Sequence, residues 1–265
     1  MDPMQLIDYS SIAASLVFFS YGSWSDLRSR EVSNKVWLLY GPIGLALTVG
    51  RVLIDPSLLV MSVVSIGLTT LLSFTVFYFG LFAGADAKAL ICLSLAMPLF
   101  PSTYETMLGY VHPILPLAVF AVGYVCSVSV AVWIGAKNLP RLFGHRAELF
   151  KGLEQEPPWK KAIAAITGYP CTVAKLSSTF YLYPMEEVVE GTDGAKRRLS
   201  LYFNAEADRD QMVAKLVSSL SKVGSPNEVW VSPGIPMIVF MLIGLIITLI
   251  FGDLIFAGLF LMMPR

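Results

Sequence analysis

Residues 56–85 read PSLLVMSVVSIGLTTLLSFTVFYFGLFAGA, and none of these thirty residues is Asp, Glu, Lys or Arg. An α-helix needs about 20 mostly apolar residues to cross the hydrocarbon core of a bilayer. The stretch is therefore long enough for a transmembrane helix and a turn. Its last three residues, Ala83, Gly84 and Ala85, are small and stand directly before Asp86. The stretch predicts a membrane protein and draws attention to the acid that follows it.

The rest of the chain repeats this pattern of uncharged stretches. They also cover 9–25, 36–50, 89–104, 106–136, 229–252 and 254–264. The pattern predicts six transmembrane helices, near residues 6–26, 33–51, 57–81, 86–99, 113–136 and 234–262. The fourth is short, and Pro98 and Pro101 are expected to end it. A half-helix or a re-entrant segment is therefore an alternative for residues 86–99.

The composition supports a membrane location. Hydrophobic residues make up 55% of the 265 residues and charged residues 14%, with a mean hydropathy of +0.67. These values exclude a purely soluble enzyme. The 19 basic and 19 acidic residues balance, so the net charge does not indicate a nucleic-acid partner. Residues 137–232 hold 24 of these charges and are too polar to insert into a membrane.

The predicted fold is an all-α polytopic membrane protein of six transmembrane helices, with a small α+β cytosolic insert between helices five and six. Residues 1–136 carry helices one to five, 137–232 form the insert, and 233–265 carry helix six. Within the insert, β-branched and aromatic residues favour a strand over 172–183. Apolar residues at helical spacing predict a helix over 206–222.

The positions of lysine and arginine predict the orientation, because basic residues near helix ends stay on the cytoplasmic side. With the N-terminus outside, the inner loops hold seventeen basic residues, and the outer side holds only Arg51 and Arg265. Both termini are then outside and the insert is cytoplasmic. The first apolar stretch follows the acidic residues Asp2 and Asp8, so it is not expected to be a cleaved signal peptide.

Metal and disulfide chemistry is not indicated. Cys92, Cys126 and Cys171 have no paired spacing, so neither a disulfide framework nor a C-x-x-C zinc site is predicted. His112 and His145 are isolated and form no metal-ligand pattern. The sequence thus predicts no metal and no cofactor, and it does not indicate an oligomeric state.

Three acids lie in or at the ends of predicted spans: Asp26, Asp86 and Asp253. Ionisable groups at membrane depth are costly, so such a carboxylate is a functional-site hypothesis. Asp26 ends the first span and Asp86 joins the third to the fourth, so both are expected at the cytoplasmic face. Asp253 falls toward the outer end of the sixth span, where a capping or pairing role is expected.

Each acid of the Asp26 and Asp86 pair also has a structural interpretation. The small residues before Asp86 allow close backbone approach and a sharp helix entry, but an aspartate there is equally consistent with capping the helix N-terminus. Asp26 is equally consistent with an interfacial acid paired with Arg28 or Arg30.

Three stretches together carry a family resemblance. They read DLRSREVSN from Asp26 to Asn34, GADAK from Gly84 to Lys88, and NEVWVSPGIP from Asn227 to Pro236. They resemble the archaeal preflagellin and prepilin peptidases, which are membrane aspartic proteases of the Gly-x-Gly-Asp type. Two positions depart from the family pattern: Ala83 replaces the glycine three places before the second aspartate, and Ala85 is the small residue just before it. The bacterial members' cysteine-rich zinc loop is absent, so their methyltransferase activity is not implied.

The resemblance implies that Asp26 and Asp86 are the catalytic pair. One carboxylate would take a proton from the attacking water while the other, protonated, hydrogen-bonds the scissile carbonyl. The implied substrate is a preflagellin or type IV pilin-like precursor, whose short basic leader is removed at the cytoplasmic membrane face. Five residues are expected to support the site or bind near it: Gly84, Ala85, Lys88, Arg28 and Arg30.

The charged residues around the pair leave alternatives open. Lys88 is expected either to tune Asp86 or to anchor the helix at the interface, and the two arginines are expected mainly to anchor the first helix. A basic leader needs an acidic surface. Four glutamates are candidates, although a solvated face is the favoured interpretation for them: Glu31, Glu186, Glu187 and Glu190.

Three other kinds of function compete with peptide cleavage. A transporter or channel would use the two aspartates as an ion or proton relay, but both acids are expected at one face and the spans show no inverted repeat. A membrane scaffold would use 137–232 as a docking module and would not need the aspartates. A presenilin-like protease would carry its acids in two consecutive later spans, whereas Asp26 ends the first.

Overall fold

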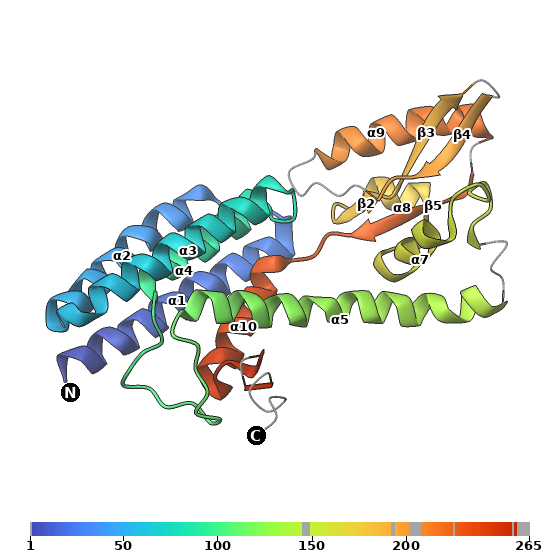
Figure 1. The fold of residues 1–265 in the computed structure, drawn as a ribbon. Helices are drawn as coiled ribbons and strands as arrows, with labels where there is room; N and C mark the ends of the chain where they lie inside the picture. The colour runs from blue at the N-terminus through green and yellow to red at the C-terminus, as the bar shows by residue number, and fades with distance from the viewer. Residues whose placement is uncertain are drawn as a thin grey trace. The chain divides into compact units, whose positions relative to one another are not determined.

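The computed structural model describes residues 2–144, 149–191, 194–201, 208–224, 226–255 and 257–258. The chain forms two compact units. The first consists of residues 1–127 and 236–265, and the second of residues 128–235. Figure 1 shows the helices of the first unit and the mixed helices and strands of the second.

The first unit is helical. Its helices are α1 (Pro3–Ser29), α2 (Asn34–Ile54), the short 3₁₀ helix η1 (Pro56–Leu58), α3 (Leu59–Tyr78), α4 (Gly84–Ala96), α5 (Leu115–Gly144) and α10 (Met237–Phe251). The six α-helices overlap the predicted spans, but α10 ends at Phe251, whereas the sequence predicts a sixth span that continues to residue 262. Gly252, with φ 90°, ends the helix, and residues 256 and 259–262 lie outside the described residues. Helix α5 continues past residue 136, the predicted end of the fifth span, and its last part belongs to the second unit.

Within the part of the chain that the structure describes, three helical stretches are long and apolar enough to cross a membrane: Asn34–Ile54, Pro56–Tyr78 and Leu115–Gly144. Helix α1 has 27 residues and is long enough but less apolar. Helices α4 and α10 have 13 and 15 residues, or about 20 and 22 Å at 1.5 Å per residue, which is less than the hydrocarbon core of about 30 Å. The molecule is thus a mostly helical multi-pass membrane protein, and the full count of six spans stays a prediction.

Helix α4 lies at the centre of the first unit. It contacts α1, α2, α3 and α10, and Lys88 is its only exposed residue. A helix that is apolar around nearly its whole circumference is expected to be buried. Its C-terminal end follows from Pro98, because a proline cannot continue the helical hydrogen bonding.

Small residues bring the helices close together. The buried face of α3 consists of Ser62, Ser65, Thr69 and Ser73. A Cβ atom added to Gly44 of α2 would lie 2.8 Å from the Cβ of Ala96 in α4, so the two backbones touch there. Membrane helices associate through such small residues, because burying apolar side chains gains little when lipid is the alternative environment.

A buried ion pair ties the opposite end of this unit, far along the helices from Asp26 and Asp86. Arg51 Nη2 lies 2.5 Å from Asp8 Oδ1, and the two side chains are 3% and 1% exposed. The Thr103 hydroxyl donates to Asp8 Oδ2 over 2.6 Å, and Arg51 Nη1 donates to the carbonyl of Leu99 over 3.4 Å. The pair therefore fastens α1 to α2 and to the loop that follows α4.

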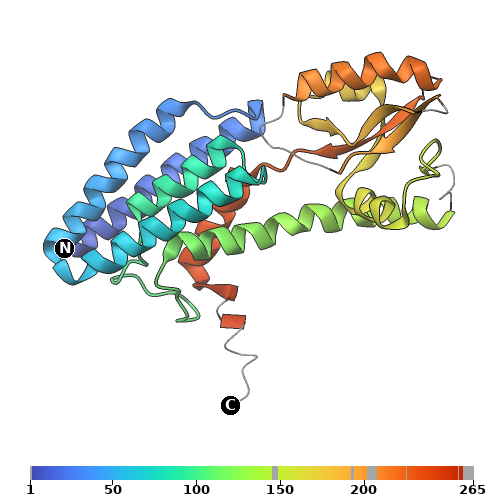
Figure 2. The ribbon, with the colours of Figure 1, turned by 45° about the horizontal axis from the view of Figure 1, so that its top comes forward.

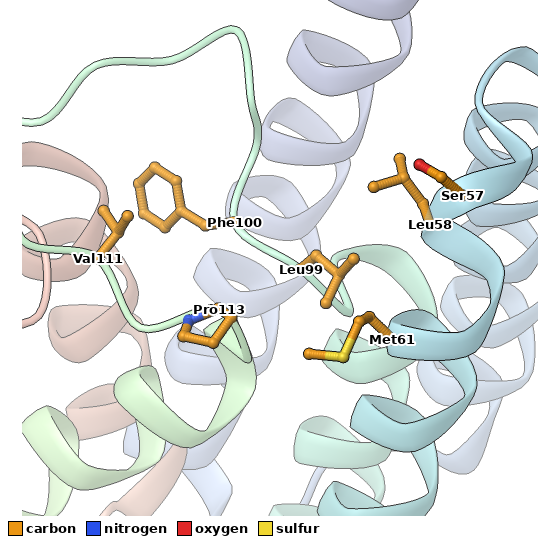
Figure 3. Close-up of a pocket in the computed structure, with 7 residues that line it drawn as sticks. All are labelled: Ser57, Leu58, Met61, Leu99, Phe100, Val111 and Pro113. Carbon is orange, nitrogen blue, oxygen red and sulfur yellow. The ribbon is translucent and has the colours of Figure 1, made fainter.

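An apolar cavity of about 270 Å³ lies beside this loop (Figure 3). Its lining residues come from η1, from the start of α3 and from both ends of the loop: Ser57, Leu58, Met61, Leu99, Phe100, Val111 and Pro113. Helix α2 separates this end from Asn34 by about 30 Å at 1.5 Å per residue. The cavity is therefore remote from the two aspartates.

The second unit is built on a three-stranded antiparallel sheet of order β1-β5-β2, with a separate β3-β4 hairpin. Its elements after α5 are α7 (Pro158–Thr167), β1 (Tyr169–Thr172), α8 (Val173–Ser178), β2 (Leu182–Pro184), β3 (Glu186–Gly191), β4 (Gly194–Leu199), α9 (Arg209–Leu220), η2 (Ser221–Val223) and β5 (Glu228–Pro233). Figure 2 shows α9 lying along one side of the strands.

Strand β5 carries both cores of this unit. Val229 and Val231 pack with α8 and α9, whereas Trp230 packs on the other side with Phe150 and α7. Successive side chains of a strand point to opposite faces, so a strand covered on both sides is apolar at each of these positions. The prediction that the chain between the fifth and sixth helices contains both helices and strands is therefore confirmed.

The predicted strand over 172–183 is wrong in its middle, where α8 forms. Thr172 begins that helix, because its hydroxyl accepts a hydrogen bond from the backbone N–H of Lys175 over 3.3 Å, an arrangement that favours a helix start. The predicted helix over 206–222 is confirmed as α9 with η2. Residues 206 and 207 lie outside the described residues.

Candidate active site

Asp26 lies in the last turn of α1, where the backbone is fixed by several hydrogen bonds. Its carbonyl oxygen accepts the N–H of Arg30 over 3.0 Å, and Arg30 ends the helix with φ 58°. The hydroxyl groups of Ser25 and Ser29 both donate to the carbonyl of Glu31, over 2.7 and 3.1 Å. A left-handed residue after a helix satisfies its last carbonyl groups, so the segment carrying Asp26 is held in one conformation.

The face of α1 that leads to Asp26 is packed against α2 and α10. A Cβ atom on Gly22 would lie 3.3 Å from Ile238 and 3.4 Å from the indole of Trp37. Residues four apart share a helix face, so Asp26 follows Gly22 on this face. The Asp26 Oδ2 atom is buried and makes no hydrogen bond within the described part of the chain. Burying an unpaired polar atom is costly, so this oxygen is a candidate for a contact with a substrate.

Trp37 was not identified from the sequence. Its side chain is 5% exposed, and its indole N–H is buried without an acceptor among the residues that the structure describes. The same face therefore presents an unpaired donor from α2 and an unpaired acceptor from α1. A tryptophan in an apolar span gives no sequence signal that its N–H has this position.

Asp86 is the third residue of α4 and is 8% exposed. Its Oδ2 atom accepts the backbone N–H of Ala83 over 3.1 Å. Gly84 and Ala85 are the first two residues of the helix, and both are half-buried. The capping interpretation is thus correct for one oxygen of Asp86, although Ala83, and not Asp86, is the N-cap residue.

Lys88 has a partner that the sequence did not suggest. Its Nζ atom donates to Asn34 Oδ1 over 2.9 Å, and Asn34 is the first residue of α2. The sequence signal for Asn34 is its place at the end of the segment that begins with Asp26. The bond connects the segment after Asp26 with the first turn of α4, two residues beyond Asp86.

The two arginines are placed differently. The Arg28 guanidinium lies 5.4 Å from the ring centre of Trp24, and both residues are exposed. Such a pairing of a tryptophan and a cation fits an interfacial anchor. Arg30 contributes its backbone to the helix end. The structure thus gives Arg28 an anchoring geometry and gives Arg30 a role in shaping the turn after Asp26.

The remaining predicted residues fall elsewhere. Glu186 does not form an acidic surface, because it is 4% exposed and pairs with Arg197 at 2.7 Å inside the second unit. Asp253 has a capping role as predicted, since its Oδ1 atom accepts the N–H of Ile255 over 2.9 Å. His145 lies outside the described residues. Cys92, Cys126 and Cys171 are free thiols.

Asp26 and Asp86 therefore lie at the same end of the helical unit. Helices α1 and α4 are in contact, and the Asn34–Lys88 hydrogen bond links the segments that carry the acids. Within the residues described, no group of three or more His, Cys, Asp and Glu side chains could hold a metal ion. Two carboxylates on neighbouring helices can act as general base and general acid.

Comparisons with known proteins cover most of the chain. Residues 13–134 match the profile described as "Type IV leader peptidase family", and residues 160–254 match that of "Archaeal Peptidase A24 C-terminus Type II". A preflagellin peptidase of Methanococcus maripaludis is 26% identical over 256 residues, which cover 94% of this chain and 96% of that protein.

Two further relatives bear the same name. A preflagellin peptidase of Methanococcus voltae is 24% identical and covers 91% of this chain and 94% of its own length. That of Methanocaldococcus jannaschii is 26% identical, with 89% and 91% covered. The matches extend over both compact units, so the likeness is not confined to the helices that carry the aspartates.

Proposed function

We propose that the chain is a member of the type IV leader peptidase family, whose model matches residues 13–134, and that it removes the leader peptide of preflagellin at the cytoplasmic membrane face. It is a protease of the aspartic type, as is usual for this family. The three relatives named above are all peptidases, so the comparisons lend no support to the transporter alternative.

Asp26 and Asp86 are the proposed catalytic pair. One ionised carboxylate takes a proton from a water molecule, whose oxygen attacks the scissile carbonyl carbon. The other carboxyl group donates a hydrogen bond to the carbonyl oxygen, and a proton passes to the leaving amine as the C–N bond breaks. The observation that carries this proposal is that both acids lie at one end of the helical unit, with one Asp26 oxygen buried and unpaired.

The proposed membrane depth of the site follows from α1. Asp8, in the buried pair with Arg51, precedes Asp26 by 18 residues, or about 27 Å along a helix. This is close to the thickness of the hydrocarbon core. With the N-terminus outside, as the basic residues predict, Asp26 lies where a membrane-anchored precursor presents the junction between its leader and its apolar helix.

The substrate backbone needs hydrogen-bond partners in this setting. The indole N–H of Trp37 is available to it, because it is buried beside the face of α1 that leads to Asp26 and has no acceptor among the described residues. Lys88 and Asn34 are proposed to hold the two acid-bearing segments together, with Gly84 and Ala85 forming the close turn into α4.

The proposal is tested with the full-length protein in liposomes and a purified preflagellin. Asp26→Asn and Asp86→Asn should each abolish leader removal, measured by gel shift and N-terminal sequencing of the product. Asp253→Asn is the matched control, since it changes an aspartate with a capping role at the end of α10. Leader removal at an unchanged rate in either dyad variant would exclude the pair as the catalytic groups.

A further inference from the structure

Helix α7 of the second unit has an unusual exposed surface. All of its exposed residues are apolar and share one helical face: Pro158, Trp159, Ala162, Ile163 and Ile166. Trp159, Ile163 and Ile166 are 58%, 39% and 50% exposed. The opposite side, with Ala164 and Ala165, is buried in the core around Trp230. A surface helix in water normally exposes its polar residues, so this face calls for an apolar partner.

The lysines of α7 do not make this face polar. The Lys160 ammonium donates to the carbonyl of Leu199 over 3.1 Å and lies 3.2 Å from Glu156. Lys161 donates to the carbonyl of Glu154 over 3.0 Å. Both charges are thus held against their own unit, and the apolar face of α7 stays uncovered.

The C-terminal end of α7 is fixed to α5. The side-chain amide of Asn138 donates to the carbonyl groups of Ala165 and Gly168, over 2.7 and 2.6 Å. Asn138 is 2% exposed. A Cβ atom on Gly135 would lie 3.5 Å from Ile166. Helix α7 therefore packs against α5 at residues 135–138.

This is the level at which α5 ceases to be apolar. The uncharged stretch ends at residue 136, and Lys137 places its ammonium 3.9 Å from the ring centre of Trp133, which is 55% exposed. Tryptophan and lysine at the end of a span mark the membrane interface. Trp133 is 18 residues beyond the start of α5 at Leu115, or about 27 Å, which matches the hydrocarbon core of about 30 Å.

From these contacts we infer that α7 is an interfacial helix whose exposed face lies in the lipid bilayer, at the boundary between headgroups and acyl chains. An amphipathic helix with tryptophan on its apolar face binds membranes in this way. The partner of the exposed α7 face is lipid. Helix α7 is fixed to α5 at residues 135–138, which is where the apolar, lipid-exposed part of α5 ends. The contact would hold the second unit to the membrane surface whether or not the site cleaves peptide.

The inference is tested by electron paramagnetic resonance on the full-length protein in nanodiscs of phospholipid. A nitroxide label is attached to Ala162→Cys, on the exposed face of α7, and to Ser218→Cys, an exposed residue of α9 in the same unit. The parent protein, labelled in parallel, gives the background from the three native cysteines. At position 162, collisions with oxygen should exceed those with a water-soluble nickel complex, and at position 218 the order should be reversed.

A second variant separates lipid from protein contact. Ile163→Glu places a carboxylate on the same face and should raise nickel accessibility at position 162 to a value near that at position 218. If position 162 were as accessible to nickel as position 218 when Ile163 is unchanged, the inference would be overturned. Protection of position 162 from both oxygen and nickel would also overturn it, because the face would then be covered by a substrate helix or a second copy.

Discussion

The Nζ atom of Lys88 donates a hydrogen bond to Oδ1 of Asn34 over 2.9 Å. The two residues are 54 positions apart, and their bond joins the first turn of α4 to the first residue of α2. Asp86 precedes Lys88 by two residues, and the turn after Asp26 leads directly into Asn34. A side-chain contact therefore connects the two segments whose relative placement the proposed reaction requires.

Loss of this bond should lower turnover more than stability. A hydrogen bond contributes about 0.5–1.5 kcal/mol, and this one joins two exposed side chains, so Lys88→Met and Asn34→Ala should each lower the unfolding free energy by no more than about 0.5 kcal/mol. Because the variants loosen the acid-bearing segments, kcat on preflagellin should fall at least tenfold with little change in KM. Steady-state cleavage assays and thermal unfolding in detergent measure the two effects.

The same bond can be tested by a double-mutant cycle. If Lys88 acts through Asn34, the double variant should be no slower than either single variant, and Lys88→Arg should restore part of the rate by retaining a donor. Lys35→Met, at an exposed lysine beside Asn34, is the control and should leave kcat unchanged. Fully additive losses in kcat would show that the two residues act independently.

Substituting Asp26 and substituting Asp86 should change the stability of the protein differently, although both residues are proposed to be needed for cleavage. Asp86→Ala removes the acceptor of the Ala83 N–H and should cost about 1 kcal/mol, the usual value for a lost helix cap. Asp86→Asn retains an acceptor and should cost less. Asp26→Asn should leave the unfolding temperature equal or higher, because the Asp26 Oδ2 atom makes no hydrogen bond within the described residues. Differential scanning fluorimetry distinguishes these outcomes.

Trp37 offers a test of substrate contact. Trp37→Phe removes the indole N–H, which has no acceptor in the described structure, and keeps most of the ring. No hydrogen bond is lost, but the ring atoms that pack against Gly22 are removed, so the unfolding free energy should fall by about 1–2 kcal/mol. The value of kcat/KM should fall about fivefold or more if the N–H binds the substrate backbone. Trp24→Phe, at an exposed ring, is the control, and equal effects at both positions would count against the contact.

The helices of the first unit were predictable because a membrane-spanning segment must be apolar over its whole length. For the same reason Asp26 and Asp86 stood out, since each is the charged residue that ends a long uncharged stretch. Their placement at helix ends also follows from the sequence: the uncharged stretch 9–25 ends at Asp26, and three small residues precede Asp86. The location of both candidate acids was therefore readable before any tertiary contact was known.

The partners of polar residues were not predictable. Each of two such pairs lies far apart in sequence. The packing of α2 against α4 brings Asn34 to Lys88, and the packing of α2 against α1 brings Arg51 to Asp8. The error over 172–183 has a different origin. A short segment with β-branched residues is compatible with strand or helix, and the choice is made by the side chain of Thr172, which caps α8.

Cys171 should react slowly with alkylating reagents in the folded protein. Burial raises the pKa of the Cys171 thiol, so at pH 7 to 8 a smaller fraction than usual is thiolate, which is the reactive form. The side chain is also only 5% exposed. Peptide mass spectrometry after timed iodoacetamide treatment should show slower modification than at an introduced Ser218→Cys, with a rate that rises with pH. Equal rates at the two sites would contradict the buried position.

The buried Asp8–Arg51 pair should matter for stability and not for chemistry. Asp8→Asn leaves the guanidinium of Arg51, 3% exposed, without its counter-charge, and breaking one side of such a pair costs about 3–5 kcal/mol. The unfolding temperature should therefore fall sharply, while kcat at low temperature stays near the parent value because Asp8 lies about 27 Å along α1 from Asp26. Combining Asp8→Asn with Arg51→Met removes the isolated charge and should recover much of the loss, whereas Glu105→Gln, at an exposed acid in the adjoining loop, should change little. If the double variant were as unstable as Asp8→Asn alone, the cost would come from lost packing and not from an uncompensated charge.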